Sequence, residues 1–427
     1  MRIIAMVVML IIMTGLFVNT GRQIFFWLTL VFKGVNQPVH GVVFSVVFGL
    51  LVVAVLAAFV ISRIPGNADL RAVFRIGHYA LGALVYLVLI VNAASLFLFL
   101  GRLFHLVPPE SGAVQMAAAG ISLLLVTGLT VCGSIHAGNI QTRRYTVRIG
   151  REQEGTDSLR IALLSDIHLG YVIEEDHLAK VVEAVNELKP DIICIAGDVF
   201  DGDATSLSNP DRLQALLGEM KAQYGVYACL GNHDAGAGYE QMLEFLSGAG
   251  VQVLLDESVV IDGRFVLAGR RDSFPIGGQG ERQRSVEGLT EASVPVGTIV
   301  SAGPAVPAGP TASPGPAVPS EKAVFPATAR LPVIVMDHQP GNIQEYGSEA
   351  DLILCGHTHQ GQMFPFNLIT NAVFDVDYGY YRKEDTGTQV IVTSGAGTWG
   401  PPLRVATDSE VVEIRVIFPE TDGGKRL

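Results

Sequence analysis

The chain has 427 residues, of which 49% are hydrophobic and 16% charged, and its mean hydropathy is +0.40. This composition is too apolar for a purely soluble protein and too poor in charge for a disordered one. Residues 1–150 hold 10 Lys/Arg and 2 Asp/Glu, which gives a net charge of +8. Residues 151–427 hold 19 Lys/Arg and 39 Asp/Glu, which gives a net charge of −20. The contrast predicts a basic membrane region followed by an acidic soluble region, and the acidic balance argues against nucleic-acid binding.

Four apolar segments predict an all-α transmembrane region. Three of them reach about 20 residues, the length that a bilayer-spanning helix needs, and they cover residues 42–61, 76–100 and 113–135. The run at 3–18 is not followed by a signal-peptidase motif, so we expect an uncleaved first span. Residues 23–35 either continue this span or lie flat at the membrane interface.

The basic residues that flank these spans indicate the side of the membrane on which the soluble region lies. Seven arginines fall on the side of both termini, against three basic residues on the opposite side. Because positively charged flanks favour the cytoplasmic side, we expect a multi-pass membrane protein whose soluble region is cytoplasmic.

From residue 159 the sequence alternates short β-rich runs with amphipathic segments. Residues 159–165 and 191–196 have the pattern of buried strands, and 175–188 between them repeats apolar residues at helical spacing. Asn209-Pro210 provides the cap and first-turn proline of another helix. Strand-like runs with fewer helices between them follow at 333–336, 351–354, 389–393 and 411–418. This order predicts an α/β domain in which a second sheet packs on the first.

The composition also predicts the limits of the regions. Residues 302–319 contain six prolines, and a segment of this kind cannot bury enough apolar surface to order itself. We expect a disordered insertion at about 275–330 within one domain, and a partner-binding proline motif is the alternative interpretation. The expected regions are a transmembrane region at 1–140, a linker at 141–156, a soluble domain at 157–418 and a C-terminal tail at 419–427.

Five polar blocks each follow an apolar strand-like run. They are S-D-I-H at 165–168, G-D-V-F-D-G at 197–202, G-N-H-D at 231–234, D-H-Q-P at 337–340 and G-H-T-H at 356–359. Any one block alone is compatible with a turn or a helix cap, but all five together hold half of the ten histidines. The recurrence therefore indicates one shared site.

The residue types in these blocks point to a metal centre. Side chains two residues apart on an extended strand point the same way, so Asp166 and His168 can bind one ion together. The potential donors are Asp166, His168, Asp198, Asn232, His338, His357 and His359. Seven oxygen and nitrogen donors exceed the need of one ion, whereas two ions bridged by a carboxylate use them all. Such a pair of ions suits displacement at phosphorus.

The series D-x-H, G-D-x-x-D, G-N-H-D, an isolated H and G-H-x-H resembles the calcineurin-like metallophosphoesterase superfamily over about residues 157–418. The four spans, the extended G-H-T-H-Q-G-Q at 356–362 and the late S-G-A-G at 394–397 with Arg404 resemble its bacterial membrane-attached branch. The resemblance implies a four-layer α/β/β/α sandwich, two divalent metal ions (Mn, Fe or Zn) and a place in the bacterial plasma membrane.

The resemblance also implies a role for each matching residue. It gives Asp166, His168 and His359 to one metal, Asn232, His338 and His357 to the other, and Asp198 to both as the bridge. His233 then faces the substrate as a catalytic residue, and Asp201 orients it. Position 202 is glycine, where the protein phosphatases of the superfamily have an arginine that binds phosphate. This difference argues against a phosphoprotein substrate.

The sequence therefore favours a membrane-anchored, two-metal-dependent phosphoesterase. It would hydrolyse a phosphomonoester, phosphodiester or pyrophosphate bond by a metal-bridging hydroxide. Some relatives cleave the pyrophosphate of UDP-diacylglucosamine, so a lipid-linked substrate at the bilayer is one candidate and a nucleotide is another. The alternatives are a non-catalytic metal-binding scaffold or membrane-associated binding module with this fold, and a channel or transporter with a regulatory domain. Few polar residues lie in the predicted spans, which argues against transport.

Overall fold

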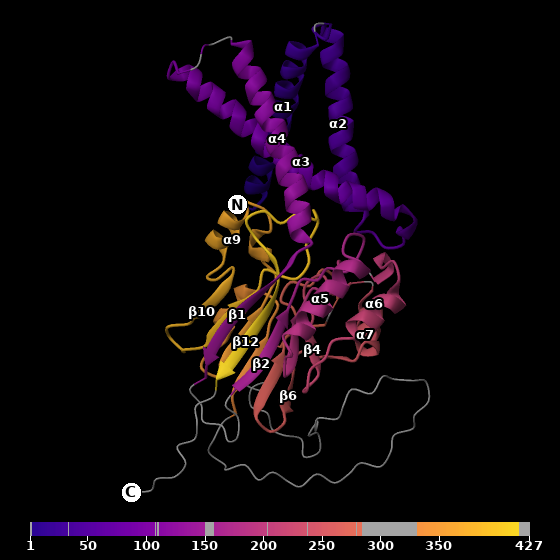
Figure 1. Ribbon diagram of the computed structural model, residues 1–427, viewed down its shortest axis with the longest axis vertical. Coiled ribbons are helices and arrows are strands. Elements are labelled where there is room, and N and C mark those ends of the chain that lie inside the picture. Colours follow the sequence, from indigo (N-terminus) through magenta and orange to yellow (C-terminus); the bar gives the residue numbers. More distant parts are fainter. Residues whose placement is uncertain are drawn as a thin grey trace. The chain divides into compact units, whose positions relative to one another are not determined.

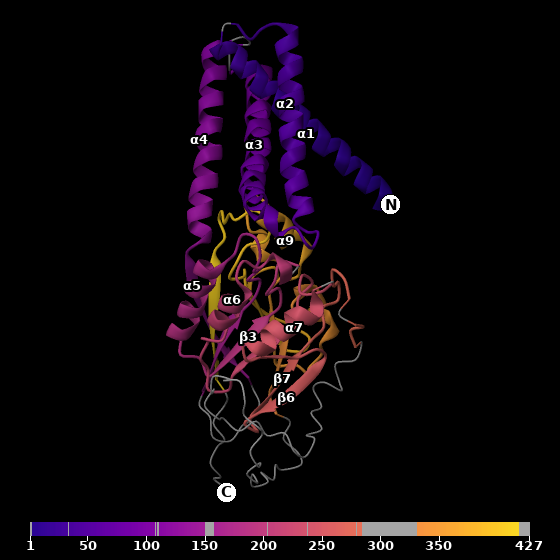
Figure 2. The same cartoon turned by 90° about the vertical axis from the view of Figure 1, so that its right-hand side faces the viewer.

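The structure is a computed structural model of the chain (Figures 1 and 2). It describes residues 2–417 apart from positions 33, 107, 109–110, 150–157, 203, 237, 279 and 284–330. Most of the expected insertion and the expected C-terminal tail lie outside these residues. The chain forms two compact units, Met1–His136 with Gly400–Leu403, and Ala137–Trp399 with Arg404–Leu427.

Four long helices make up most of the first unit. They are α1 (Arg2–Val31), α2 (Pro38–Ile61), α3 (Arg71–Leu103) and α4 (Gly112–Ala137), and a short 3₁₀ helix, η1 (Ala68–Leu70), precedes α3. Each long helix contains a segment long and apolar enough to cross a membrane, as the sequence predicted. Helix α1 is continuous through residue 31, so residues 23–31 continue the first span.

Uncharged polar side chains connect these apolar helices. Asn92 of α3 donates to the hydroxyl of Thr20 in α1 at 2.8 Å. Gln115 of α4 accepts from the side-chain amide of Gln23 at 3.1 Å and from the indole N–H of Trp27 at 3.0 Å, both in α1. Hydrogen bonds between helices in a bilayer contribute on the order of 1 kcal/mol each, so these contacts join α1 to α3 and α4.

Close approach between helices occurs where the residues are small. A Cβ on Gly77 of α3 would lie 2.6 Å from Cβ of Ala58 in α2, so only glycine fits at this crossing. The late segment Gly400–Leu403 packs against the same two helices. A Cβ on Gly82 of α3 would collide with Leu403, and one on Gly400 would lie 3.3 Å from the ring of Phe59 in α2.

The second unit contains two six-stranded sheets and the helices that flank them. The first sheet has the order β1 (Ile140–Arg148), β12 (Ser409–Ile417), β2 (Ser158–Leu164), β3 (Ile192–Ala196), β4 (Val226–Cys229), β5 (Val251–Val253). The second has the order β10 (Gly379–Arg382), β11 (Gln389–Val392), β9 (Leu352–Cys355), β8 (Val333–Met336), β7 (Phe265–Gly269), β6 (Glu257–Ile261). The helices are α5 (Glu175–Glu187), α6 (Pro210–Leu217), α7 (Tyr239–Gly248), α9 (Asn367–Val373), η2 (Ala204–Ser206), η3 (Pro340–Glu345) and η4 (His359–Gly361).

Three apolar cores hold the layers of this unit together. Alternate residues of a strand face opposite sides, so Leu164 of β2 packs with α5, α6 and α7, whereas Leu163 packs between the two sheets. The outer face of the second sheet packs against Ile343 of η3 and the adjacent Tyr346. The expected α/β sandwich of two sheets is confirmed, and the short 3₁₀ helix η3 contributes Ile343 to the layer outside the second sheet.

The structure differs from the sequence analysis at residues 141–148, which we expected to be a linker. They form most of β1, which runs parallel to β12 at the edge of the first sheet (Figure 1). Arg144 of β1 pairs with Glu413 of β12 at 2.8 Å, and Arg143 pairs with Asp408. The arginines gave the segment the polar character of a linker, but cross-strand acidic partners stabilise it as an edge strand.

Candidate metal centre

The polar blocks lie where parallel strands of both sheets end. In the first sheet they follow β2, β3 and β4, and in the second they follow β8 and β9. Backbone hydrogen bonds join them: the amide of Asp166 donates to the carbonyl of Gly197 at 3.0 Å, and the amide of Gly356 donates to the carbonyl of His338 at 3.0 Å. Nδ1 of His338 also lies 2.8 Å from the carbonyl oxygen of Ala196, which connects the two sheets. One site thus forms at the shared edge.

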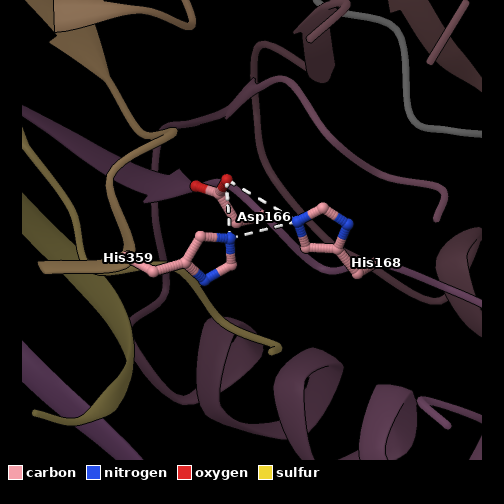
Figure 3. A group of neighbouring side chains, drawn as sticks. All are labelled: Asp166, His168 and His359. Atoms are coloured by element: carbon pink, nitrogen blue, oxygen red, sulfur yellow. Dashed lines mark hydrogen bonds and ion pairs between the residues drawn. The ribbon is translucent and has the colours of Figure 1, made fainter. Parts of the chain in front are cut away.

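Three buried side chains converge in the first group (Figure 3). Nε2 of His168 lies 3.1 Å from Nε2 of His359, and Oδ1 of Asp166 lies 3.3 Å from Nε2 of His359. Oδ1 of Asp166 is 3.9 Å from Nε2 of His168. Two imidazole nitrogens and one carboxylate oxygen directed at one another are a suitable donor set for a divalent cation.

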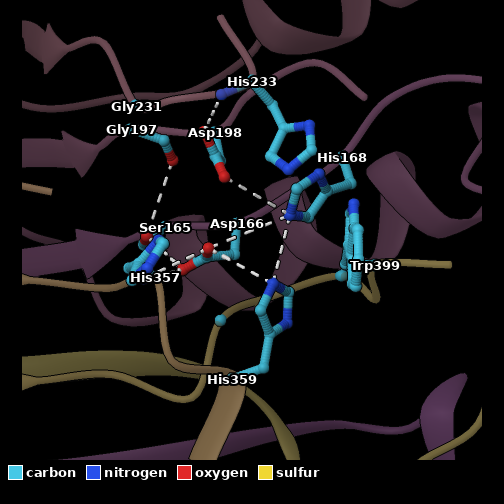
Figure 4. Close-up of polar contacts among 12 residues, drawn as sticks. Ser165, Asp166, His168, Gly197, Asp198, Gly231, His233, His357, His359 and Trp399 are labelled. Carbon is cyan, nitrogen blue, oxygen red and sulfur yellow. Dashed lines mark hydrogen bonds and ion pairs between the residues drawn. The ribbon is translucent and has the colours of Figure 1, made fainter. Parts of the chain in front are cut away.

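A second group adjoins the first and shares Asp166 with it. Oδ2 of Asp198 lies 3.2 Å from Nε2 of His338 and 3.7 Å from Nε2 of His168, so this carboxylate stands between the two groups. The structure brings the remaining pair together as well, because Nδ1 of His357 lies 3.0 Å from the amide oxygen of Asn232. The rings of His338 and His357 are 5.1 Å apart. All seven expected ligands therefore gather at one place, and Figure 4 labels Asp166, His168, Asp198, His357 and His359 among them.

The backbone reaches this arrangement through left-handed turns. We expected pairs such as Asp166 and His168 to lie on extended strands, but these residues follow the strands and have φ of 52° and 53°. Asp198, His357 and His359 have φ of 53°, 73° and 50°. Non-glycine residues in this region carry a cost of order 1–3 kcal/mol each and cluster at functional sites. The shared direction of the side chains therefore comes from strained turns.

Two glycines allow the turns to pack closely. Gly197 has φ of +84°, and a Cβ there would lie 2.7 Å from both the amide nitrogen of Gly231 and Nδ1 of His338. A Cβ on Gly231 would lie 2.6 Å from the amide nitrogen of Asp198. Side chains at either position would displace the predicted ligands, as expected for glycines beside a metal centre.

Charge and burial divide the histidines into two kinds. Burial lowers the pKa of His338, but the charge of Asp198 and the hydrogen bond to it outweigh burial and raise the pKa well above its usual value. Burial lowers the pKa of His357 to about 3 and that of His359 well below its usual value. Neutral imidazoles are the form that binds metal, so His357 and His359 are ready to bind and His338 must first release a proton.

The predicted catalytic histidine lies at the margin of this cluster. The amide of His233 donates to Oδ1 of Asp198 at 2.8 Å, and its ring centre lies 5.2 Å from that of His168 and 5.8 Å from that of Trp399. Asp201, which we expected to orient His233, places Oδ1 3.6 Å from Nδ1 of His168. This carboxylate therefore contacts a predicted metal ligand, and its expected role toward His233 stays a prediction.

Sequence analysis missed three supports of the site. The guanidinium of Arg404, which is fully buried, donates to the carbonyl oxygens of His359 at 2.9 Å and Gly397 at 2.8 Å. Burial lowers its pKa to about 10. The carboxylate of Asp234 accepts from the amides of Gly231 and Phe200 at 2.9 and 2.8 Å, which fixes the G-N-H-D turn. The third is Trp399, whose ring lies beside that of His233. The available signals were the place of Asp234 in the G-N-H-D block and the places of Trp399 and Arg404 shortly after the S-G-A-G run.

Comparison with known proteins agrees with this geometry. The family model described as calcineurin-like phosphoesterase matches residues 159–361. An uncharacterized metallophosphoesterase of Aquifex aeolicus is 31% identical over 65% of this chain and 92% of its own length. One from Helicobacter pylori is 30% identical over 61% of this chain and 60% of its own length. A zebrafish (Danio rerio) transmembrane protein with a metallophosphoesterase domain is 29% identical over 77% of this chain and 71% of its own length. The chain belongs to the calcineurin-like metallophosphoesterase family, as a metal-dependent phosphoesterase with four apolar helices before its catalytic domain.

Proposed function

We propose that this protein is a membrane-anchored hydrolase of phosphomonoester, phosphodiester or pyrophosphate bonds that uses two divalent metal ions. The observation that carries the proposal is the position of Asp198, whose Oδ2 lies within 3.7 Å of imidazole nitrogens from both groups, His168 and His338. A carboxylate with a donor on each side is what two neighbouring cations require as a bridge.

The donor set fits such a pair of ions. Seven oxygen and nitrogen donors without a thiolate suit Mn, Fe or Zn better than Mg. Bound cations of this kind activate water at neutral pH and neutralise charge on the phosphoryl oxygens. The assignment that we propose is Asp166, His168 and His359 for one ion, Asn232, His338 and His357 for the other, and Asp198 for both.

The general acid of the proposed reaction is a side chain of the protein, His233. His233 is held by its backbone contact to Asp198 but is absent from both groups of converging metal donors. We assign its imidazole the donation of a proton to the leaving oxygen and the stabilisation of charge at the phosphoryl group. A Cβ on Gly202 would lie 3.9 Å from Nδ1 of His233, so the position of the phosphatase arginine lies beside this imidazole. The glycine leaves substrate binding there to His233 and the metal ions.

The location that we propose follows from the basic residues that flank the helices. Seven arginines on the side of the catalytic domain, against three basic residues opposite, favour a cytoplasmic catalytic domain at a bacterial plasma membrane. The bilayer is then a constant neighbour of the enzyme, and a lipid-linked substrate such as UDP-diacylglucosamine is a candidate beside nucleotides.

The test is metal analysis and hydrolysis by the full-length protein in lipid nanodiscs. We expect about two metal ions per chain and turnover of at least one of bis-p-nitrophenyl phosphate, p-nitrophenyl phosphate and UDP-diacylglucosamine. Asp198→Asn is the inactive control. Two bound metals without hydrolysis of any of the three would favour the alternative, a non-catalytic metal-binding scaffold.

A further inference from the structure

An exposed apolar surface lies close to the metal centre. Among the described residues of the second unit, eight large hydrophobic side chains are exposed, and five of them come from the segment 364–373 and the adjacent loop. We call these five the apolar rim: Phe364, Leu368, Ile369, Val373 and Trp399. Helix α9 supplies three of them and has no buried residue, and Leu368 and Val373 are 61% and 69% exposed. Helices of soluble domains normally bury an apolar face.

Hydrogen bonds hold the rim to the rest of the domain, and one rim residue lies beside His233. The side chain of Gln362 accepts from the amide of Trp399 at 2.8 Å and donates to the carbonyl of Trp399 at 3.0 Å. The ring of Trp399 in turn lies 5.8 Å from the ring of His233. On the other side, the hydroxyl of Thr370 in α9 donates to Asp377 at 2.8 Å. The rim is therefore held to the domain, and Trp399 brings it next to His233.

The rim contains no charge. Residues 364–374, with the sequence F-P-F-N-L-I-T-N-A-V-F, lack Asp, Glu, Lys and Arg, although the chain after residue 150 is strongly acidic. Transfer of a charged side chain to an apolar medium is costly. Transfer of residues 364–374 into such a medium moves no charged side chain. Contiguous exposed apolar side chains in such a setting indicate a surface that binds another apolar surface.

Two short covalent connections join the second unit to the transmembrane helices. Helix α4 ends at Ala137 and β1 begins at Ile140, and three residues span at most about 10 Å. A second connection is shorter still, because Trp399 precedes Gly400, the first residue of the segment that packs with α2 and α3. The apolar partner within reach of this surface is the lipid bilayer itself.

We propose that the apolar rim inserts into the interfacial layer of the bilayer, among the upper parts of the acyl chains. Amphipathic elements of this kind bury their apolar face about 5–10 Å into the boundary between head groups and acyl chains, and tryptophan favours this depth. The proposal also gives the enzyme a substrate class, which rests on the proposed function: a phosphoester carried by a lipid in the bilayer, with its apolar part held beside His233.

The two tryptophans of the chain, Trp27 and Trp399, make insertion measurable without any assay of activity. In a Trp27→Phe/Trp399→Phe background, Leu368→Trp places one fluorophore on the rim, and Tyr380→Trp, at a 44% exposed residue of β10, is the matched control. Both proteins are placed in nanodiscs whose lipids carry bromine on the acyl chains. We expect strong quenching of Leu368→Trp, greatest with bromine near the glycerol end, and little quenching of Tyr380→Trp.

Equal and weak lipid quenching of both variants, with ready quenching of Leu368→Trp by aqueous acrylamide, would overturn the proposal. Weak quenching of Leu368→Trp by lipid and acrylamide alike would also overturn it, since a second copy or another protein would then cover the rim. Size-exclusion profiles and metal content that match the unsubstituted protein establish that each variant is folded.

The substrate class is tested with two phosphodiesters that share a leaving group. Hexadecyl p-nitrophenyl phosphate in the nanodisc and ethyl p-nitrophenyl phosphate in solution differ only in the apolar chain. Leu368→Ser/Ile369→Ser should lower kcat/KM at least about tenfold for the hexadecyl ester, with little change for the ethyl ester. Equal loss for both would reject a lipid-bound substrate. Failure to hydrolyse either ester, with Leu368→Trp still quenched, would reject a lipid phosphodiester as the substrate and leave the inserted rim, whereas the proposed function is rejected only if the three substrates of its own test also remain intact.

Discussion

Oδ1 of Asp201 lies 3.6 Å from Nδ1 of His168, while Nε2 of the same ring lies 3.1 Å from Nε2 of His359. A carboxylate on one nitrogen of a metal-binding imidazole fixes the tautomer and the ring orientation, and so leaves the other nitrogen free to bind. Burial lowers the pKa of His168, but the contact with the Asp201 carboxylate and the charge of Asp198 outweigh burial and raise this pKa above its usual value. Asp201 is therefore placed to orient a predicted metal ligand.

Replacement of Asp201 should consequently weaken metal binding. We expect Asp201→Asn to lower the affinity of the site around His168 by about 10- to 100-fold, the usual cost of losing such a partner. Titration of the apoprotein with Mn2+ or Zn2+ measures this directly, with Asp211→Asn, an exposed residue of the first turn of α6, as control. Unchanged metal affinity with a lower kcat on poor leaving groups would instead support the role that the sequence predicted, orientation of His233.

The sequence predicted which residues meet, but not how the backbone brings them together. The recurrence of polar blocks after apolar strands was sufficient to predict that Asp166, Asp198 and His338 meet, because parallel strands end at a common edge. The left-handed turns are set by long-range packing, such as the close contact between Gly197 and Gly231. No local pattern in a single strand contains that information.

Removal of the proposed bridging carboxylate, Asp198, should affect both ions. Asp198 has a pKa well below its usual value, because the charge of His338 and its hydrogen bond outweigh the effect of burial. We expect Asp198→Asn to lower metal content at both sites and to abolish turnover, measured by elemental analysis and hydrolysis of bis-p-nitrophenyl phosphate. Asp262→Asn, at a 48% exposed side chain, controls for loss of a carboxylate. Full activity with two metals retained would reject the bridge.

Metal affinity should rise with pH. The charge of Asp198 and its hydrogen bond with His338 outweigh the effect of burial and hold the pKa of His338 well above its usual value. The apoprotein therefore keeps a proton on His338 at neutral pH. A cation must displace this proton, and binding therefore strengthens as pH increases toward that pKa. We expect the apparent Kd to fall about tenfold per pH unit for each displaced proton.

Calorimetric titration in two buffers of different ionisation enthalpy counts the protons released on metal binding. We expect at least about one per chain from about pH 6 to about pH 8. A Kd independent of pH over this range, without proton release, would mean that His338 is already neutral before the metal binds.

The apolar rim and β1 were beyond sequence analysis for a common reason. Leu368, Ile369 and Val373 have the residue types of any buried helix, and only the structure shows that α9 has no buried residue. Arg143 and Arg144 have the residue types of a linker, but their segment is a strand because it pairs with β12, far away in the sequence. In both cases the local sequence does not contain the long-range contacts, or their absence, that distinguish the two structures.

The last prediction separates catalysis from metal binding at His233. Its ring lies beside those of His168 and Trp399, and its backbone amide, which a substitution keeps, makes the contact to Asp198. His233→Ala should therefore retain both metals and reduce kcat by about 10²- to 10⁴-fold, the usual contribution of general acid catalysis. The loss should shrink for p-nitrophenolate, because a good leaving group needs little protonation. Asn232→Ala is the informative comparison, since loss of a ligand should lower metal content first. If His233→Ala loses metal, or keeps its kcat on a poor leaving group, His233 is not the acid.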